Sequence, residues 1–277
     1  MTYVPAPEIA AERMDETRRA FDGVAGDYDG PRGNNALVRK MRRRMWATVT
    51  GLFPSGARLA DLGCGTGIDA EHFGRLGYRV VAMDASPEMV RRTRRRVRVA
   101  GLEEGVTVRQ LGIQDLDSLG DARFDGMYSN LGALNCVPDL HVAAAECARH
   151  LRPGGMLVFS IIGRLCPWET IFYLLTGRPR RAVVRLRRGM VPVVMNGGIV
   201  WTRYHTPREF FRAFESRFDL THYRALALFA PPPYLIRLYV KAGACCDALS
   251  RLDDRVGHRP LLRDAGDHFL MVLTKRD

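Results

Sequence analysis

The chain has 277 residues, 47% of them hydrophobic, which is enough apolar side chain for one sizeable core. Its net charge of +12, from 42 basic and 30 acidic residues, favours anionic partners but determines no fold. No run of about 18 apolar residues occurs, so we expect no membrane span. The N-terminus lacks the basic start and apolar stretch of a secretory signal, and we expect a cytoplasmic protein. The six cysteines show no zinc-type spacing, so no metal site is predicted.

Strand-like and helix-like stretches alternate through the first half, which predicts a parallel sheet covered on both faces. A helix is expected after Ser86, where a hydroxyl cap precedes Pro87 and Glu88, and another over 140–151, stopped by the Pro-Gly-Gly at 153–155. Five stretches are typical of strands: Arg58–Leu62, Tyr78–Met83, Val106–Leu111, Phe124–Ser129 and Met156–Ile162.

The alternation stops after Gly163. Residues 164–203 combine an apolar run over 168–175 with a cluster of arginines. Two further strands are predicted over 220–229 and 268–275, joined through a helical stretch from Tyr234 to about Leu252. The prediction is therefore an α/β fold with a doubly wound, seven-stranded, mostly parallel sheet.

We expect a single domain over residues 1–277. Its parts are a core over 20–162, a lid of helix and strand over 163–203 inserted between strands five and six, and a C-terminal part over 204–277 with the last two strands and their connecting helix.

A glycine-rich turn follows the first strand and opens a helix, reading Asp61-Leu62-Gly63-Cys64-Gly65-Thr66-Gly67. Glycines let the backbone turn tightly and approach a ligand, and ligands in such sheets bind beyond the carboxyl ends of the strands. The nicotinamide fingerprint requires a further glycine where this chain has Ile68. The carboxylate of Asp61 would repel a pyrophosphate, but it suits a ligand that carries an ammonium and a sulfonium.

With Asp84 closing the second strand, Asp115 after the third, and Leu151-Arg152-Pro153-Gly154-Gly155 before the fifth, the chain resembles the class I S-adenosylmethionine-dependent methyltransferases over roughly residues 20–162. The resemblance implies S-adenosylmethionine as cofactor. The residues that it implies around the cofactor are Tyr28, Asp61, Gly63, Cys64, Gly65, Asp84, Ala85, Met89, Gln114, Asp115, Asn130 and Leu131.

In this resemblance Asp61 would act near the methionine amino group, and Asp84 would accept hydrogen bonds from the ribose hydroxyls. Many relatives carry an acid directly after the glycine that follows strand three, whereas Gly112 here is followed by Ile113 and Gln114. Either Gln114 or Asp115 would therefore meet the adenine amino group.

Methyl transfer from a sulfonium is an in-line displacement, which mainly requires orientation and, for a weak nucleophile, removal of a proton. His205 is the first candidate base, because an unperturbed imidazole titrates near neutral pH. Glu169, entering an apolar stretch, is the second, and Tyr204 the third. The alternatives are a packing or surface histidine and a first-turn helix acid.

The apolar run over 168–175 and the arginines over 178–188 would suit an amphiphilic acceptor, lipid-like or isoprenoid, with a phosphate or carboxylate. A helix packed on the core with a solvated basic face is the alternative. We expect a small-molecule acceptor and no nucleic acid, since Ser129-Asn130-Leu131-Gly132 lacks the Pro-Pro-aromatic signature of base-modifying enzymes. A nucleic-acid methyltransferase and a protein that binds the cofactor but catalyses a pericyclic reaction remain the rival hypotheses. We expect a monomer or a homodimer.

Overall fold

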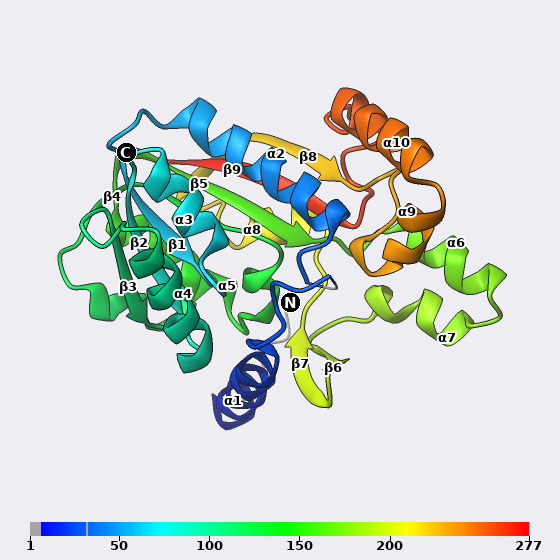
Figure 1. The fold of residues 1–277 in the computed structure, drawn as a ribbon, viewed down its shortest axis with the longest axis horizontal. Coiled ribbons are helices and arrows are strands. Elements are labelled where there is room, and N and C mark those ends of the chain that lie inside the picture. The colour runs from blue at the N-terminus through cyan, green and yellow to red at the C-terminus, as the bar shows by residue number, and fades with distance from the viewer. Residues whose placement is uncertain (1–6, 32, 277) are drawn as a thin grey trace.

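The computed structural model describes residues 7–31 and 33–276. One sheet of seven strands runs through the molecule in the order β3-β2-β1-β4-β5-β9-β8 (Figure 1). The pairs from β3 to β5 are parallel, and β9 is antiparallel to both β5 and β8. The expected seven-stranded α/β fold is thereby confirmed. The strands span β1 Arg58–Leu62, β2 Arg79–Asp84, β3 Val106–Gln110, β4 Phe124–Ser129, β5 Leu151–Ile162, β8 Phe218–Leu226 and β9 His268–Lys275.

Helices cover both faces of this sheet. One buried cluster joins the sheet to α2, α3 and α4, with Phe73 and Met45 fully buried in it. The other joins the sheet to α5, α8 and the short helix η1, with Phe210 and Phe214 at its centre. The helices span α2 Ala36–Leu52, α3 Ile68–Arg75, α4 Pro87–Val99, η1 Ile113–Leu119, α5 Leu140–His150 and α8 Pro207–Arg212.

The chain between β5 and α8 leaves the sheet and forms two separate parts. The first is an arm of short helices, α6 Pro167–Leu175, α7 Pro179–Ala182 and η3 Val184–Leu186. The second is an antiparallel hairpin of β6 Val191–Met195 and β7 Gly198–Thr202, turning at Asn196-Gly197. Figure 1 shows the hairpin beside α1 Pro7–Val24 and the arm beside α9 Ile236–Lys241.

Some boundaries differ from the expectation for local reasons. The helix predicted over 140–151 ends at His150, because Leu151 already pairs with Phe124 in the sheet. The single helix expected from Tyr234 to Leu252 is divided into η4 Pro233–Leu235, α9 and α10 Gly243–Val256. Ala242, with φ −139° and ψ 45°, interrupts it. The short helix η2 Ala133–Cys136, which follows β4, was not predicted.

Candidate functional site

The glycine turn after β1 lies against the carboxyl end of β2. The backbone N–H groups of Gly63 and Cys64 both donate to the carbonyl oxygen of Met83, at 2.9 and 2.8 Å. Gly63, Gly65 and Gly67 have φ values of 78°, 55° and 82°, which L side chains rarely adopt. A Cβ on Gly63 would also lie 2.4 Å from the Cβ of Ala133. The turn therefore requires glycine both for its conformation and for this close approach.

Asp84 ends β2 at the same edge of the sheet. Its Oδ2 accepts a hydrogen bond from the N–H of Gly65 at 2.8 Å, and its Oδ1 accepts one from the N–H of Ser86 at 2.9 Å. Burial raises the pKa of this carboxyl, while the two backbone donors oppose the shift. The carboxylate is thus held rigidly by the turn and by the start of α4, with lone pairs left for a ligand.

Asp61 lies beneath the turn and is 1% exposed. No standard hydrogen bond reaches its Oδ2 from the described residues, although the nearby hydroxyl of Tyr128 lowers the pKa of the carboxyl. Burial and then the nearby Asp69 raise the pKa of Asp61 well above its usual value. A buried carboxylate oxygen without a donor is costly, so burial at this position favours the neutral carboxyl.

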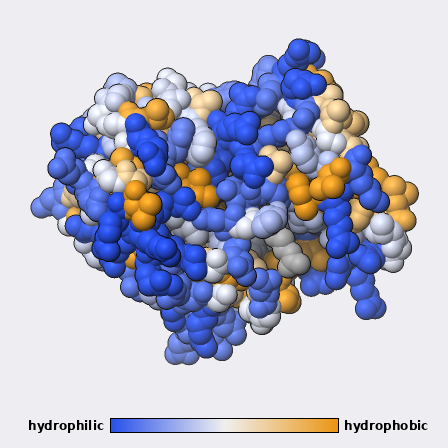
Figure 2. Space-filling view, in the orientation of Figure 1, coloured by the Kyte–Doolittle hydropathy of each residue, from blue (hydrophilic) through white to orange (hydrophobic). Residues whose placement is uncertain are grey.

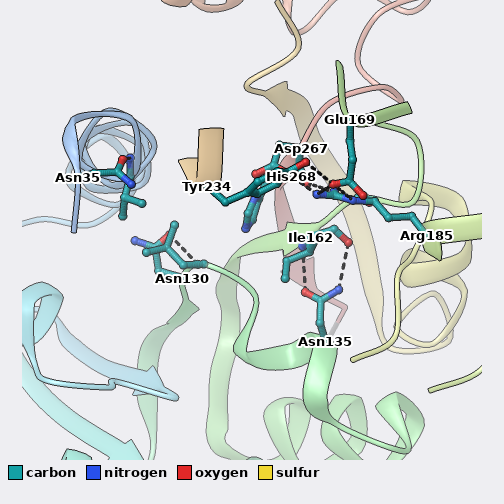
Figure 3. Close-up of polar contacts among 12 residues, drawn as sticks. Asn35, Asn130, Asn135, Ile162, Glu169, Arg185, Tyr234, Asp267 and His268 are labelled. Atoms are coloured by element: carbon teal, nitrogen blue, oxygen red, sulfur yellow. Dashed lines mark hydrogen bonds and ion pairs between the residues drawn. The ribbon is translucent and has the colours of Figure 1, made fainter. Parts of the chain in front are cut away.

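A second polar network supports the turn from α2 and α3. Asp69 accepts hydrogen bonds from the guanidinium of Arg42, from Trp46 Nε1 at 2.6 Å and from Asn130 Nδ2 at 3.1 Å. Asn130, just past β4, is thereby fixed with its side-chain oxygen on the N–H of Leu131 (Figure 3). Leu131 adopts φ 56°, so the chain bends sharply at this point.

A cavity of 580 Å³ opens over the glycine turn. It brings together most of the cofactor residues that the sequence suggested; those on its wall are Tyr28, Gly63, Gly65, Asp84, Ala85, Met89, Gln114, Asn130 and Leu131. Asp61, Cys64 and Asp115 are not on the wall. The thiol of Cys64 points to Thr93, and the Asp115 carboxylate accepts from Gln114 Nε2 at 2.9 Å, so Gln114 faces the cavity in place of Asp115.

Tyr28 closes the cavity from the N-terminal side. Its ring packs edge-on against Phe21 of α1, with 6.3 Å between ring centroids. Burial raises the pKa of Tyr28 to about 12, so the hydroxyl stays protonated at neutral pH. The next residue, Asp29, accepts a hydrogen bond from Thr66 and pairs with Arg96 of α4. The Tyr-Asp pair is therefore fastened to the glycine turn.

The far end of the cavity is apolar, and sequence reasoning missed most of it. Its wall comes from α1, from η2 and the residue after it, from the end of β5 and from the β6–β7 hairpin; these residues are Met14, Phe21, Cys136, Val137, Ile162, Val193, Val194, Met195, Val200 and Thr202. Helix α1 also brings Asp15, Thr17 and Arg18 to the cavity. We call this part the apolar lobe. An Asn-Gly pair between two apolar stretches is a strong hairpin signal, and Asn196-Gly197 could have revealed these strands.

None of the three candidate bases lies on the cavity wall. His205 is 4% exposed, and burial, with Arg203 and Arg164, lowers its pKa to about 3, which leaves the imidazole neutral. Tyr204 is buried beside Arg185, 5.4 Å from the guanidinium carbon to the ring centroid. Glu169 accepts hydrogen bonds from Arg185 Nε at 2.9 Å and from the Tyr234 hydroxyl at 2.6 Å (Figure 3).

The side chains of Cys166, Glu169 and Asp267 come close enough to share a metal ion. Arg185 already occupies this place as a cation, since its guanidinium reaches both carboxylates, at 2.7 and 2.6 Å. The arginine cluster expected to meet an acceptor is thus divided: Arg185 is buried in ion pairs, and Arg178, Arg180, Arg181, Arg187 and Arg188 are exposed. Neither α6 nor these arginines line the cavity.

Among the described residues, no helix combines the length and hydrophobicity needed to cross a lipid bilayer.

Comparison with known proteins agrees with this geometry. Residues 60–159 match a family described as a methyltransferase domain. The chain is 38% identical over 140 residues to a ubiquinone biosynthesis O-methyltransferase of Xanthomonas axonopodis pv. citri, covering 50% of this chain and 56% of that protein. The corresponding protein of Xylella fastidiosa is 39% identical over 112 residues. The chain thus spans about half the length of the curated relatives it matches.

Solved structures show the same fold at low sequence identity. The cyclase SpnF superposes with a TM-score of 0.62 at 16% identity, covering 100% of this chain and 99% of that one. A Burkholderia thailandensis 1,6-didemethyltoxoflavin-N1-methyltransferase, solved with S-adenosylhomocysteine, gives a TM-score of 0.57 at 20% identity, covering 100% and 93%. At these identities the likeness concerns the fold.

Proposed function

We propose that this chain, whose residues 60–159 match a methyltransferase domain, is a class I S-adenosylmethionine-dependent methyltransferase that transfers a methyl group to a small molecule with an apolar body. The observation that supports this most directly is the continuity of one cavity, which runs from the glycine turn and Asp84 into the apolar lobe. The cofactor and an acceptor would therefore share one cavity.

The residues present fit the cofactor. Asp84, on the cavity wall, has free lone pairs for the ribose hydroxyls. The buried Oδ2 of Asp61 lies behind the wall and would act on the ammonium of the methionine part through water. Gly63 and Gly65 line the cavity, and a Cβ on Gly63 would collide with Ala133 of the same wall. When bound, S-adenosylmethionine supplies a methyl group on a positively charged sulfur, which is already activated as a leaving group.

In this reaction the chain would orient the cofactor and the acceptor and exclude water from the cavity. Tyr28 and α1 cover the cofactor side of the cavity, and the hairpin covers the apolar lobe. Holding nucleophile and methyl carbon in line supplies most of the acceleration in such a displacement. An acceptor with an apolar body gains binding free energy from the lobe, roughly 25 cal/mol per Å² of apolar surface buried.

His205, Glu169 and Tyr204 lie behind the cavity wall, so the observations support a catalytic role for them less well than they support binding of the cofactor in the cavity. The neutral imidazole of His205 could accept a proton only through a group that connects it to the acceptor. If His205 acts in this way, His205→Ala lowers kcat, most strongly for acceptors with a high pKa, and leaves KM unchanged.

The test combines binding and turnover. S-adenosylhomocysteine at about 100 times its Kd should add roughly 2.7 kcal/mol of stability, measured as a rise in Tm, whereas NAD should add none. Incubation with S-adenosylmethionine and a panel of apolar amines, phenols and enols should then yield a product heavier by one methylene group. Binding without methylation, but with a rearranged acceptor of unchanged mass, would favour the pericyclic hypothesis; no binding at all would refute the proposal.

A further inference from the structure

The arm between β5 and the hairpin carries apolar side chains that the rest of the described chain leaves uncovered. Ile171, Leu174 and Leu175 of α6 are 56%, 55% and 83% exposed, and Val183 and Leu186 are 47% and 51% exposed. Figure 2 shows hydrophobic residues gathered on the right of the molecule, where Figure 1 places α6 and α9. Clusters of exposed aliphatic side chains mark surfaces that bind another apolar phase.

The inner side of the arm is anchored to the rest of the fold, and this anchoring holds the aliphatic side chains in exposed positions. Arg185 of η3 donates to Glu169 of α6 and to the carboxylate and carbonyl of Asp267, at the start of β9, with all three side chains buried. Its Nη1 also donates to the carbonyl of Gly163 at 3.0 Å. Trp168 donates to the carbonyl of Phe229. Both ends of the arm are thus tied to segments that follow or precede strands of the sheet, and Figure 3 shows Arg185 with Glu169 and Asp267.

The charge around the exposed aliphatic residues is of one sign. Residues 164–203 contain a single acidic residue, Glu169, which is buried against Arg185. The exposed arginines of the arm follow α6 directly; they are Arg178, Arg180, Arg181, Arg187 and Arg188. In Figure 2 strongly hydrophilic residues lie directly below the hydrophobic group, at α7.

From this arrangement we propose that the arm, Pro167–Arg188, docks on the surface of an anionic lipid bilayer. The aliphatic side chains of α6 and η3 would enter the boundary between headgroups and acyl chains, and the arginines would pair with lipid phosphates. Aliphatic side chains favour lipid over nucleic acid, because bases bind by stacking on aromatic rings. Docking is separate from the cofactor cavity, since neither α6 nor the arginines line it.

Co-sedimentation with vesicles tests the proposal. The full chain should bind vesicles that contain phosphatidylglycerol, bind pure phosphatidylcholine far more weakly, and dissociate as salt is raised. Leu174→Ser with Leu175→Ser should abolish binding. Arg180→Gln with Arg188→Gln should weaken it by about tenfold or more, given a several-fold contribution from each cation. The matched control is Arg95→Gln with Arg98→Gln on α4, which changes net charge equally and should bind as the unaltered chain does.

The measurement can overturn the proposal in several ways. Failure of the unaltered chain to bind anionic vesicles would do so, as would equal weakening by the α4 control, which would indicate net charge alone. Stronger retention on RNA than on vesicles, or a dimer that the Leu174→Ser and Leu175→Ser change dissociates, would assign the surface to a different partner. Binding of S-adenosylhomocysteine should be equal in all four proteins, which separates docking from the proposed methyl transfer.

Discussion

Asp61 is the residue on which the electrostatics of the site depend. Its carboxylate has a buried oxygen without a donor, next to the like charge of Asp69. Both features disfavour the ionised form in the empty protein, and both are relieved when a cation binds. Such a residue lowers the stability of the fold and raises affinity for the ligand.

We therefore expect Asp61→Asn to weaken binding of S-adenosylhomocysteine by about 10- to 100-fold, the range of a lost charge-assisted hydrogen bond. The same change should raise the Tm of the ligand-free protein, because it removes a charge that burial disfavours. Titration calorimetry and thermal unfolding measure the two effects. An unchanged Kd would contradict the role assigned to Asp61.

The pH dependence of binding has a definite sign. Because the pKa of Asp61 is raised in the ligand-free protein, the carboxyl becomes protonated at a higher pH than an ordinary aspartate. A protonated carboxyl cannot pair with an ammonium, so affinity should fall as pH is lowered through this raised pKa. In Asp61→Asn this loss of affinity on acidification should be smaller. Calorimetry at several pH values between about 5 and 8, where most proteins are most stable, would measure it.

At the scale of elements, α1 and the β6–β7 hairpin act together as the cover of the cavity. The N–H of Trp201 in β7 donates to Thr17 Oγ1 at 3.0 Å, and its indole N–H donates to Glu16 at 2.6 Å. On the cofactor side, Asp22 of α1 accepts from the hydroxyl of Ser86, just after Asp84. One helix therefore contacts both the acceptor side and the cofactor side of the site.

Alternation along β7 gives a matched pair of substitutions. Val200 is 6% exposed and lines the cavity, whereas its neighbour Ile199 is 37% exposed and does not. Val200→Phe should reduce the volume of the apolar lobe and raise the acceptor KM about tenfold or more, because added side-chain volume has the largest effect where packing is tight. The Kd of S-adenosylhomocysteine should stay within about twofold of its value in the unaltered chain. Ile199→Phe should change neither constant. Equal effects of both would show that the hairpin does not shape the acceptor site.

The contact between α1 and the hairpin can be tested by proteolysis. The ring of Trp201 packs under Arg13, 4.1 Å from the guanidinium carbon to the ring centroid, and bonds Glu16. Trp201→Leu removes both contacts, together worth about 1–3 kcal/mol. Trypsin should then cleave within α1 faster, and S-adenosylhomocysteine should protect less well than in the unaltered chain. An unchanged cleavage rate would mean that other contacts hold α1.

At the scale of the whole molecule, the buried cluster of Arg185, Glu169 and Asp267 joins segments that are far apart in sequence. It fixes the arm to the junction of β5 and β9, where the sheet changes from parallel to antiparallel pairing. Arg185 and then His268 hold the pKa of Asp267 far below its usual value, although burial alone would raise it. Glu169 thus has a structural role in this cluster.

Arg185→Met leaves the buried carboxylates of Glu169 and Asp267 without the guanidinium that joins them and should lower the free energy of unfolding by about 3–5 kcal/mol. In the unaltered chain the pKa of Asp267 is depressed, so its ionised form stabilises the fold above the ordinary aspartate pKa, and this stabilisation is lost only in strong acid. In the variant the pKa of Asp267 should rise, so stability should be lost at a higher pH than in the unaltered chain. Urea unfolding at several pH values measures both. Glu169→Gln should show a smaller loss of the same kind; a fall in kcat with unchanged stability would instead support Glu169 as a base.

The sequence was informative where chemistry depends on the order of residues in one short segment. Asp61, Gly63, Gly65 and Asp84 are close to one another because a strand, a tight turn and a helix leave few other arrangements, so the turn and its ligand class could be predicted. The alternation of strands and helices likewise predicted the seven-stranded sheet. Gln114 and Asp115 could not be separated in this way, since one turn of η1 decides which of them faces the cavity.

What only the tertiary structure decided is where the segment after β5 lies. Its composition suggested an acceptor wall made of α6 and the arginines, yet packing places the hairpin and α1 at the cavity and turns α6 outward. The reason is that local patterns report periodicity and polarity, while the position of an inserted segment follows from contacts such as Arg185 with Asp267, 82 residues apart. The amino-acid order by itself thus determined the sheet and the glycine turn, and long-range packing determined what surrounds the apolar lobe of the cavity.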